Sequence, residues 1–283
     1  METRSERVEQ GGERPHDRYG EGGSAALVFV PALGTPARIY ARFAATLAEQ
    51  GVAVLVPELR GVGRSPLRAE RDTDWGYADL VDGEVAAAIT AARQQWPDRP
   101  LWLGGHSLGG HLALLHQARH PTQSVDGLLL VASGAPYWRS YAGSMAWITR
   151  GFGALVGMST RLCGYFPGHR LGFGGRQAAS LMLDWSAFLR SGEPQARGWS
   201  DSDWRTRLQQ LTRPALAMHI PGDRYAPPAA IRHLLSLTAI RCEPEDAAYP
   251  DTPGHFGWLK QPAPVVERTV QTLQPASLAG AGG

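Results

Sequence analysis

Short apolar runs alternate with segments of helical spacing along most of the chain, and this order restricts the possible folds strongly. Each run is continuous and closed by turn residues, as expected of a strand buried on both faces. The expected strands are residues 26–34, 52–65 (running into a Gly-rich loop), 101–105, 125–134, 214–223 and 239–246. The expected helices lie within residues 36–51, 77–96, 107–120, 227–237 and 258–273. Strands alternating with helices predict an α/β fold, with a mostly parallel sheet flanked by helices.

The alternation breaks between residues 135 and 212, which divides the chain into regions. With 283 residues, of which 43% are hydrophobic, the chain can form one large domain with an insertion, or two small domains. The stretch is rich in aromatic residues and Gly, holds helical fragments at 141–158 and 176–190, and is too long for a plain loop. The predicted regions are a disordered N-terminal tail (1–24), an α/β core (25–134 and 213–275), an inserted, mainly helical cap (135–212) and a flexible C-terminal tail (276–283).

Charge and cysteine content narrow the function classes. The 28 basic and 26 acidic residues give a formal net charge of +2, which is too balanced for a nucleic-acid interface. Cys163 and Cys242 lie far apart without ligand spacing, so we expect reduced thiols and no metal site. The N-terminal region lacks the apolar segment of a signal peptide, and no apolar stretch approaches the ~20 residues of a membrane span. We therefore expect a cytoplasmic protein. The sequence does not indicate its oligomeric state.

One turn in this pattern has the composition of a catalytic site. Gly105-His106-Ser107-Leu108-Gly109 satisfies G-x-S-x-G between an expected strand and an expected helix, which is the context that the motif requires. A serine in such a tight turn has strained backbone angles, and side chains at positions 105 or 109 would collide with neighbouring backbone. The helix N-terminus offers unpaired N–H groups where an oxyanion would form. The alternative is a Gly-rich turn without chemistry.

Three motifs in order, "LRGVGRS", "GGHSLGGH" and "PGHFGWL", carry a resemblance over roughly residues 25–275. The chain resembles the α/β-hydrolase superfamily and, more narrowly, the serine aminopeptidase/monoacylglycerol-lipase-like branch of bacterial hydrolases. The resemblance implies a Ser–acid–His triad in that chain order, an oxyanion hole of two N–H groups and an acyl-transfer mechanism.

Gly61 and Gly63 of the first motif do not belong to a phosphate-binding loop, because the lysine and the helix start of such a loop are missing.

A serine nucleophile needs a base, and an imidazole base needs a carboxylate to hold its tautomer. His255 lies in the turn-rich "YPDTPGHFGWLK", after the last expected strand, where the resemblance also places the histidine. His106 and His111 flank the serine turn, with His111 expected to pack under the sheet. His120 lies at a helix end and His219 inside a strand. His255 is the predicted base, with a role in stabilising its loop as the alternative.

Asp223 is the predicted acid because it ends the fifth expected strand. The D-x-x-x-P spacing of the family is met by Asp223 and Pro227. Asp126, at the wrong end of its strand, and Glu245 or Asp246 are the other candidates. The alternative role for Asp223 is a helix N-terminal cap, a common function of Asp.

The oxyanion hole is expected to use the N–H of Leu108, the residue after the nucleophile. The resemblance gives Leu33 as the second donor, in the loop after the first core strand. The family usually has His-Gly just before this position, whereas this chain has Pro31-Ala32. A backbone donor does not depend on its side chain, so the hole can survive that substitution. Losing one such donor typically costs about 10²–10³ in turnover.

Aromatic residues of the inserted cap suggest the substrate. Most are expected to form the core of the cap, while an inner aromatic wall over a serine would favour apolar acyl or aryl groups. They are Tyr137, Trp138, Tyr141, Trp147, Phe152, Tyr165, Phe166, Phe173, Trp185, Phe188, Trp199 and Trp204.

The predicted function is therefore a serine hydrolase that cleaves small-molecule carboxylic esters, with no metal or organic cofactor. An aminopeptidase or a thioesterase would use the same triad. A ligand-binding protein without turnover, or an acyltransferase whose cap excludes water, would use the same fold.

Overall fold

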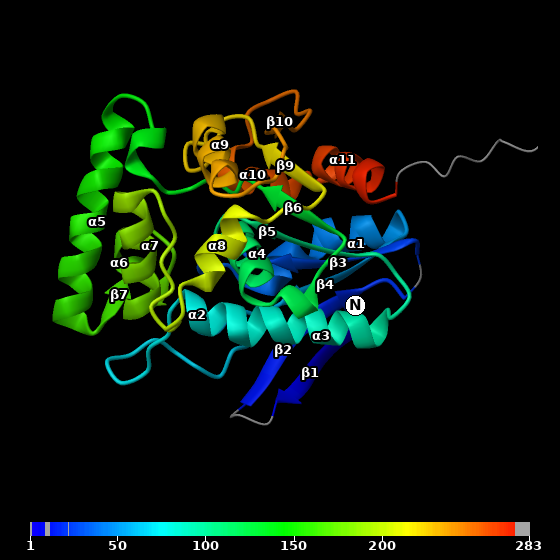
Figure 1. Cartoon of the computed structure of the whole chain (residues 1–283), viewed down its shortest axis with the longest axis horizontal. Coiled ribbons are helices and arrows are strands. Elements are labelled where there is room, and N and C mark those ends of the chain that lie inside the picture. The colour runs from blue at the N-terminus through cyan, green and yellow to red at the C-terminus, as the bar shows by residue number, and fades with distance from the viewer. Residues whose placement is uncertain (1, 9–11, 22, 275–283) are drawn as a thin grey trace, which may run out of the picture.

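The computed structural model describes residues 2–8, 12–21 and 23–274. The C-terminal tail predicted at 276–283 lies outside the described residues. An eight-stranded sheet forms the centre, in the order β1-β2-β4-β3-β5-β6-β9-β10, and helices flank it (Figure 1). Its strands are β1 (Glu2–Val8), β2 (Gly12–Tyr19), β3 (Ala25–Val30), β4 (Val52–Pro57), β5 (Leu101–His106), β6 (Gly127–Val131), β9 (Ala215–His219) and β10 (Glu245–Asp246). All neighbours from β4 to β10 pair in parallel, which confirms the predicted α/β class.

Helices connect the parallel strands, and α1 packs on both β4 and α11 while α4 packs on β5 and α8. The α-helices outside the insertion are α1 (Ala41–Glu49), α2 (Tyr77–Leu80), α3 (Ala86–Gln95), α4 (Leu108–Arg119), α9 (Pro228–Ser236), α10 (Gly254–Gly257) and α11 (Ala263–Leu273). The helix α8 (Asp203–Gln209) is the last helix of the insertion. A π-helical turn, Val81–Val85, joins α2 to α3, and short 3-10 turns occupy Ala37–Tyr40, Pro121–Gln123, Trp138–Ser140 and Trp258–Lys260. β3, β4, β5 and β6 are buried at every position, as continuous apolar runs require.

The N-terminal region corrects one prediction. Disorder was expected over residues 1–24, but β1 and β2 form a hairpin, and β2 pairs antiparallel with β4 from His16 opposite Pro57 to Tyr19 opposite Val54. His16 to Tyr19 are buried, and the Asp17 carboxylate lies 2.7 Å from the Arg64 guanidinium. A polar composition concealed this strand because its backbone hydrogen bonds, rather than apolar side chains, attach it to the exposed edge of β4.

The other strand that departs from expectation is β10. A strand was expected over 239–246, but only Glu245 and Asp246 pair, in parallel with Met218 and His219. The strand is at the edge of the sheet and its two residues are exposed, so there is little apolar burial to extend it.

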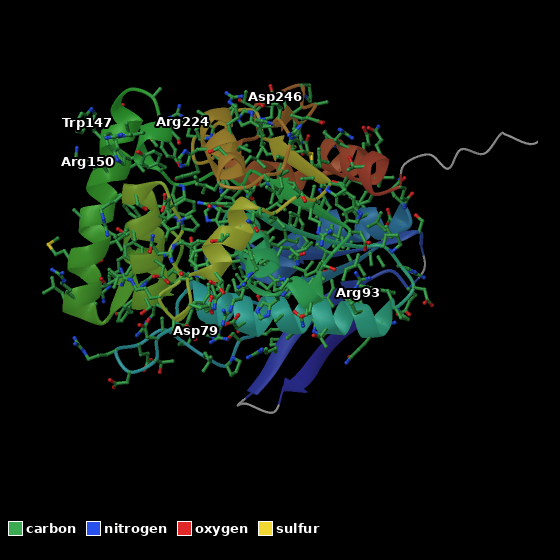
Figure 2. The ribbon with its side chains drawn as sticks, viewed as in Figure 1. Asp79, Arg93, Trp147, Arg150, Arg224 and Asp246 are labelled. Carbon is green, nitrogen blue, oxygen red and sulfur yellow. The ribbon has the colours of Figure 1, made fainter. Side chains whose placement is uncertain are left out.

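The chain between β6 and β9 includes residues 135–212, which we call the inserted segment. It contains α5 (Ser144–Cys163), α6 (Gly168–Leu171), α7 (Ala179–Ser191), the short strands β7 (Tyr165–Pro167) and β8 (Arg176–Ala178), and α8. α5 and α7 pack side by side at one side of the molecule (Figure 1) and correspond to the two helical fragments expected there. Val156, Phe166 and Met182 form a small separate core beneath them. Trp147 and Arg150 on α5 point outward, away from this core (Figure 2).

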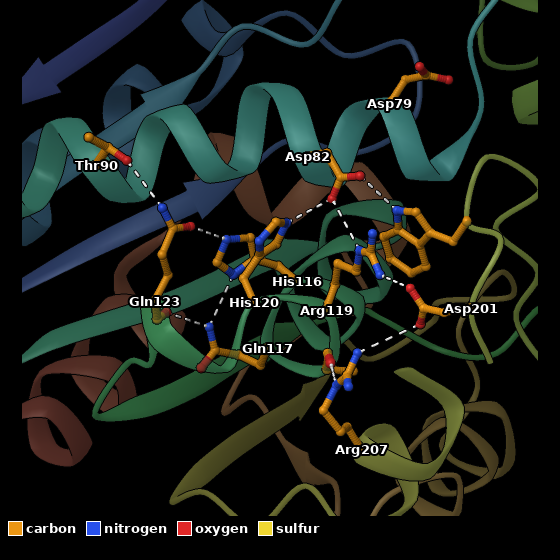
Figure 3. A network of polar contacts seen from close by, with 12 residues as sticks. Asp79, Asp82, Thr90, His116, Gln117, Arg119, His120, Gln123, Asp201 and Arg207 are labelled. Atoms are coloured by element: carbon orange, nitrogen blue, oxygen red, sulfur yellow. Dashed lines mark hydrogen bonds and ion pairs between the residues drawn. The ribbon is translucent and has the colours of Figure 1, made fainter. Parts of the chain in front are cut away.

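A polar network holds the returning end of the inserted segment against the core (Figure 3). Asp82 accepts hydrogen bonds from the Trp199 indole N–H at 2.8 Å and from His120 Nε2 at 2.7 Å. The Arg119 guanidinium donates a hydrogen bond to the Asp201 carboxylate, and Arg207 donates one to the Ala118 carbonyl at 2.6 Å. Because His120 and Arg119 end α4, the network ties the inserted segment to the helix that begins just after Ser107.

Candidate active site

Ser107 lies in a strained turn between β5 and α4, as the motif predicts. Its backbone angles are φ 55° and ψ −116°, in a region that non-glycine residues rarely adopt. Its amide N–H donates to the Val131 carbonyl at 3.1 Å, and its carbonyl accepts from the Gly110 N–H at 3.0 Å. These bonds at the carboxyl edge of the sheet fix the turn that presents the serine hydroxyl.

Two glycines make this turn possible. A Cβ at Gly105 would lie 2.2 Å from the backbone carbon of Gly109, and a Cβ at Gly109 would lie 2.0 Å from the Val30 carbonyl oxygen. Both distances are far shorter than any non-bonded contact, and the opposing atoms are backbone. The steric requirement inferred from the motif therefore holds at both positions.

Asp223 and His255 are hydrogen-bonded to each other. His255 Nδ1 lies 2.7 Å from Asp223 Oδ2, while Asp223 Oδ1 accepts from the Tyr225 N–H at 2.8 Å and the Ala226 N–H at 3.1 Å. The Asp223 side chain is completely buried and that of His255 is 8% exposed. One carboxylate oxygen thus holds the imidazole while the other holds the turn before α9. The loops are joined directly as well, because the Gly254 N–H donates to the Pro221 carbonyl at 3.0 Å.

The alternative acids have other partners. Asp126 accepts from the Leu101 N–H at 2.7 Å, Glu245 forms an ion pair with Arg268, and Asp246 lies 2.7 Å from His219 Nδ1. Of the four candidate carboxylates, Asp223 is the one that contacts His255 among the described residues.

The two expected oxyanion donors, Leu33 and Leu108, line the same cavity as Ser107 and His255. Within the described residues, neither amide N–H donates a backbone hydrogen bond, which leaves both available to a ligand. The preceding amide, that of Ala32, instead donates to the Tyr40 hydroxyl at 2.9 Å. That contact fixes the loop in which Pro31-Ala32 replace the usual His-Gly.

The shared cavity has a volume of about 570 Å³ and lies between the carboxyl edge of the sheet and the inserted segment. Four of the twelve predicted aromatic residues line it: Tyr141, Phe152, Phe173 and Trp185. Others are interior residues, as Trp204 and Phe188 are fully buried. The remaining lining residues include aliphatic, small and aromatic side chains but no Asp, Glu, Lys or Arg among the described residues. The cavity thus offers an uncharged, largely apolar surface beside the serine.

Sequence reasoning missed a buried contact behind the site. The Tyr40 hydroxyl lies 2.9 Å from His106 Nδ1, and because it already accepts the Ala32 N–H it is assigned as the donor. The His106 ring packs on the His255 ring, with centroids 4.7 Å apart. Burial holds the pKa of His106 well below its usual range, so this neighbour of His255 stays uncharged. No local motif signals the pair, since Tyr40 and His106 meet only through the fold.

His111 also differs from expectation, because it lines the cavity rather than packing under the sheet. Its Nε2 donates to the Gly134 carbonyl at 2.9 Å, and burial lowers its pKa to about 4. His111 is therefore neutral near pH 7 and adds no charge to the cavity wall.

Comparison with known proteins fits this geometry. Residues 23–166, about half of the chain, match the family model described as "Serine aminopeptidase, S33". The chain belongs to this hydrolase family. The match ends within the inserted segment, covers the serine turn and stops before Asp223 and His255. Family membership confirms the resemblance to the α/β-hydrolase superfamily drawn from the motifs.

Individual known proteins resemble the chain over part of its sequence or in fold alone. The lipase LipV of Mycobacterium tuberculosis (strain ATCC 25618 / H37Rv) is 32% identical over 113 residues, which are 40% of this chain and 39% of LipV. The matched segment thus spans well under half of either protein. The esterase EaEST of Exiguobacterium antarcticum superposes with a TM-score of 0.64 at 18% identity, over 95% of this chain and 98% of the other. A haloalkane dehalogenase loop variant, DbeA-M1 of Bradyrhizobium elkanii, also reaches 0.64, at 16% identity over 97% and 96%. Likeness to enzymes of such different reactions carries the fold alone.

Two further observations bear on partners. Among the described residues, none of the helices combines the length and the apolar character that crossing a bilayer would require. The same residues contain no cluster of three or more His, Cys, Asp or Glu side chains placed to hold a metal ion.

Proposed function

We propose that this protein is a serine hydrolase that cleaves carboxylic esters with apolar acyl or aryl groups. The observation that carries the proposal is the buried 2.7 Å contact between Asp223 and His255, with His255 and Ser107 on the wall of one uncharged cavity. Family membership supports hydrolysis in general. In this proposal the inserted segment is a cap over the site, and the cytoplasm remains the location predicted from sequence.

The proposed mechanism uses protein groups alone. Ser107 Oγ attacks the ester carbonyl as His255 Nε2 takes its proton, and the Leu33 and Leu108 amides stabilise the oxyanion. His255 then gives the proton to the leaving alcohol, which leaves an acyl group on Ser107. Water, deprotonated by His255, releases the acid. Asp223 holds Nδ1 protonated throughout and stabilises the imidazolium.

An aminopeptidase is the second candidate, because the description of the family names that activity. Such an enzyme must bind the α-ammonium group of its substrate, and a buried ammonium requires a carboxylate or comparable acceptors. The cavity wall has no Asp or Glu among the described residues. An uncharged wall instead favours esters without a charge beside the scissile bond, so we rank the esterase first.

Hydrolysis of two substrate panels tests the assignment. We expect turnover of p-nitrophenyl esters, with kcat/KM rising from acetyl to medium acyl chains as more apolar surface is buried. Amino-acid p-nitroanilides should react far more slowly. Ser107→Ala serves as the background control, and its loss of at least about 10⁴ in kcat is expected from the removal of a triad nucleophile. A preference for anilides would overturn the ester assignment and keep the triad, while undiminished turnover by Ser107→Ala would overturn both.

A further inference from the structure

The outer side of α5 carries large apolar side chains that no other part of the described chain covers. Trp147, Met158 and Leu162 are 66%, 58% and 72% exposed. At 3.6 residues per turn, positions 147, 151, 154, 158 and 162 lie along one side of the helix. We call these five residues the outer stripe: Trp147, Gly151, Ala154, Met158 and Leu162. All five are exposed and none is polar.

A contiguous exposed apolar patch marks an interaction surface more often than a single exposed residue does. The opposite side of α5 is already used, because Val156 belongs to the small core and Phe152 lines the cavity. Figure 2 shows Trp147 projecting from the edge of the molecule, with Arg150 beside it. The helix is therefore apolar on two sides, and only one of them is covered.

The charge around the outer stripe favours an anionic partner. Residues 127–183 contain no Asp or Glu, although the chain holds 26, and they contain five arginines: Arg139, Arg150, Arg161, Arg170 and Arg176. The Arg150 guanidinium lies over the Trp138 and Trp147 rings, at 5.3 and 5.7 Å from their centroids. Arg176 has an acidic partner, Glu70, at 3.8 Å across the neighbouring loop. Arg150 and Arg161 on α5 are exposed and flank the stripe.

We propose that the outer stripe of α5 binds the surface of an anionic lipid bilayer. A helix that lies in the interface buries its apolar side at the boundary of headgroups and acyl chains, and it places Trp and Arg at the headgroups. Arginines near such a surface gain attraction to anionic lipids. Ile148 links this surface to the site, because its side chain is 60% exposed and also lines the cavity. A bilayer on the stripe would therefore lie beside the cavity that holds Ser107. This proposal concerns binding and does not depend on ester turnover.

Vesicle flotation of the full chain tests the proposal directly. The probes are vesicles of phosphatidylcholine alone and of phosphatidylcholine mixed with phosphatidylglycerol. The variants are the triple change Trp147→Ser, Met158→Ser, Leu162→Ser and the double change Arg150→Gln, Arg161→Gln. Leu67→Ser, at a leucine that is 40% exposed in a loop of the core, is the matched apolar control. Arg93→Gln, on α3, is the matched charge control. Circular dichroism establishes that each variant is folded.

We expect the wild-type protein to float with the anionic vesicles and to bind the neutral ones much more weakly. The triple change should weaken binding by about tenfold or more, through lost apolar burial. The double change should weaken it by about 25-fold at low salt, about fivefold for each arginine. Both controls should bind as the wild type does.

Equal binding to neutral vesicles, or undiminished binding by the triple variant, would overturn the proposal. So would a stable dimer in sedimentation that the triple change dissociates, because the stripe would then be covered by a second copy of the chain. Binding by the Ser107→Ala variant equal to that of the wild type is expected, which separates this result from any result on turnover.

Discussion

The turn around Ser107 is closely packed against neighbouring backbone, whereas the outer side of α5 is surrounded by open space. At the turn, Gly105 and Gly109 lie directly against backbone atoms, which leave no room for a Cβ, and Ser107 adopts a strained conformation. On α5, a Cβ at Gly151 or Gly157 would meet nothing within 4 Å. The proposed nucleophile therefore lies where backbone packing permits only glycine at positions 105 and 109. The proposed bilayer-binding surface belongs to a helix in which added Cβ atoms at Gly151 and Gly157 meet open space.

Replacing Asp223 by Asn should produce the largest effect on the constrained side. The variant keeps an acceptor for the Tyr225 and Ala226 amides, but it no longer stabilises the required tautomer and charge of His255. We expect kcat to fall by about 10⁴, as for the equivalent change in a triad, with little loss of stability. Steady-state hydrolysis of a p-nitrophenyl ester measures it.

Asp246→Asn is the matched control, because Asp246 also contacts a histidine Nδ1 at 2.7 Å, that of His219. Its kcat should stay within about twofold of wild type. Similar losses in the two variants would remove the special role of Asp223.

A methyl group at position 109 should break the turn itself. In Gly109→Ala, the new Cβ would clash with the Val30 carbonyl at 2.0 Å, and β3 or α4 must shift. We expect the free energy of unfolding to fall by about 3 kcal/mol or more. Urea denaturation measures it, and an unchanged midpoint and slope would contradict the close approach of the two backbones.

Asp184 on α7 gives the contact between the inserted segment and the core a dependence on pH. Its carboxylate accepts from the Tyr77 N–H at 3.3 Å, and burial raises its pKa to about 6, against the opposing effect of Arg197. In the unfolded chain the carboxyl has a pKa near 4. Because its pKa is higher in the folded state, its contribution to stability is fully present below pH 4 and is lost as the pH rises through 6. The whole shift corresponds to about 3 kcal/mol, and we expect about 1–3.

The measurement compares the free energy of unfolding of wild type and Asp184→Asn at pH 4.5 and 7.5. The free energy of unfolding of wild type minus that of Asp184→Asn should be greater at pH 4.5 than at pH 7.5. His106 and His111 act in the opposite sense, because their pKa values are lowered by burial and the fold loses stability as the pH falls below about 6.5. They are present in both proteins and cancel in the comparison. Exposed Asp98→Asn is the control, and an equal response from it would contradict the role of Asp184.

Gly157→Ala should give the smallest effect, and of opposite sign to that at position 109. Gly157 lies inside α5 with helical backbone angles and open space around it, so alanine reduces the entropy lost on folding without a clash. We expect a gain of about 0.5–1 kcal/mol in the free energy of unfolding. A loss of stability would show that this part of α5 is more closely packed than the structure has it.

Local patterns predicted most of the core and the residues of the candidate site. The continuous apolar runs became β3 to β6 because a parallel sheet buries both faces, and the turn residues after them became the loops of the site. Ser107, Leu33, Leu108 and His255 reach one cavity because the carboxyl ends of parallel strands share one edge. Their catalytic roles remain predictions until they are tested.

The features that the sequence concealed depend on contacts between distant segments. β2 was missed because its partner, β4, supplies hydrogen bonds that no composition rule records. The Tyr40–His106 contact and the cavity position of His111 arise from how the 3-10 turn Ala37–Tyr40 and α4 pack on the sheet. The network of Asp82 with Trp199 joins residues 117 positions apart. Periodicity describes one element at a time, and these contacts belong to pairs of elements.

Covalent labelling of Ser107 is a direct test of whether His255 activates this serine. A fluorophosphonate probe reacts with a serine only when a neighbouring base activates it, and peptide mass spectrometry locates the label. We expect a label on Ser107 in the wild-type protein and a rate at least about 10²-fold slower in His255→Ala. A label on another residue, or an equal rate in His255→Ala, would contradict it.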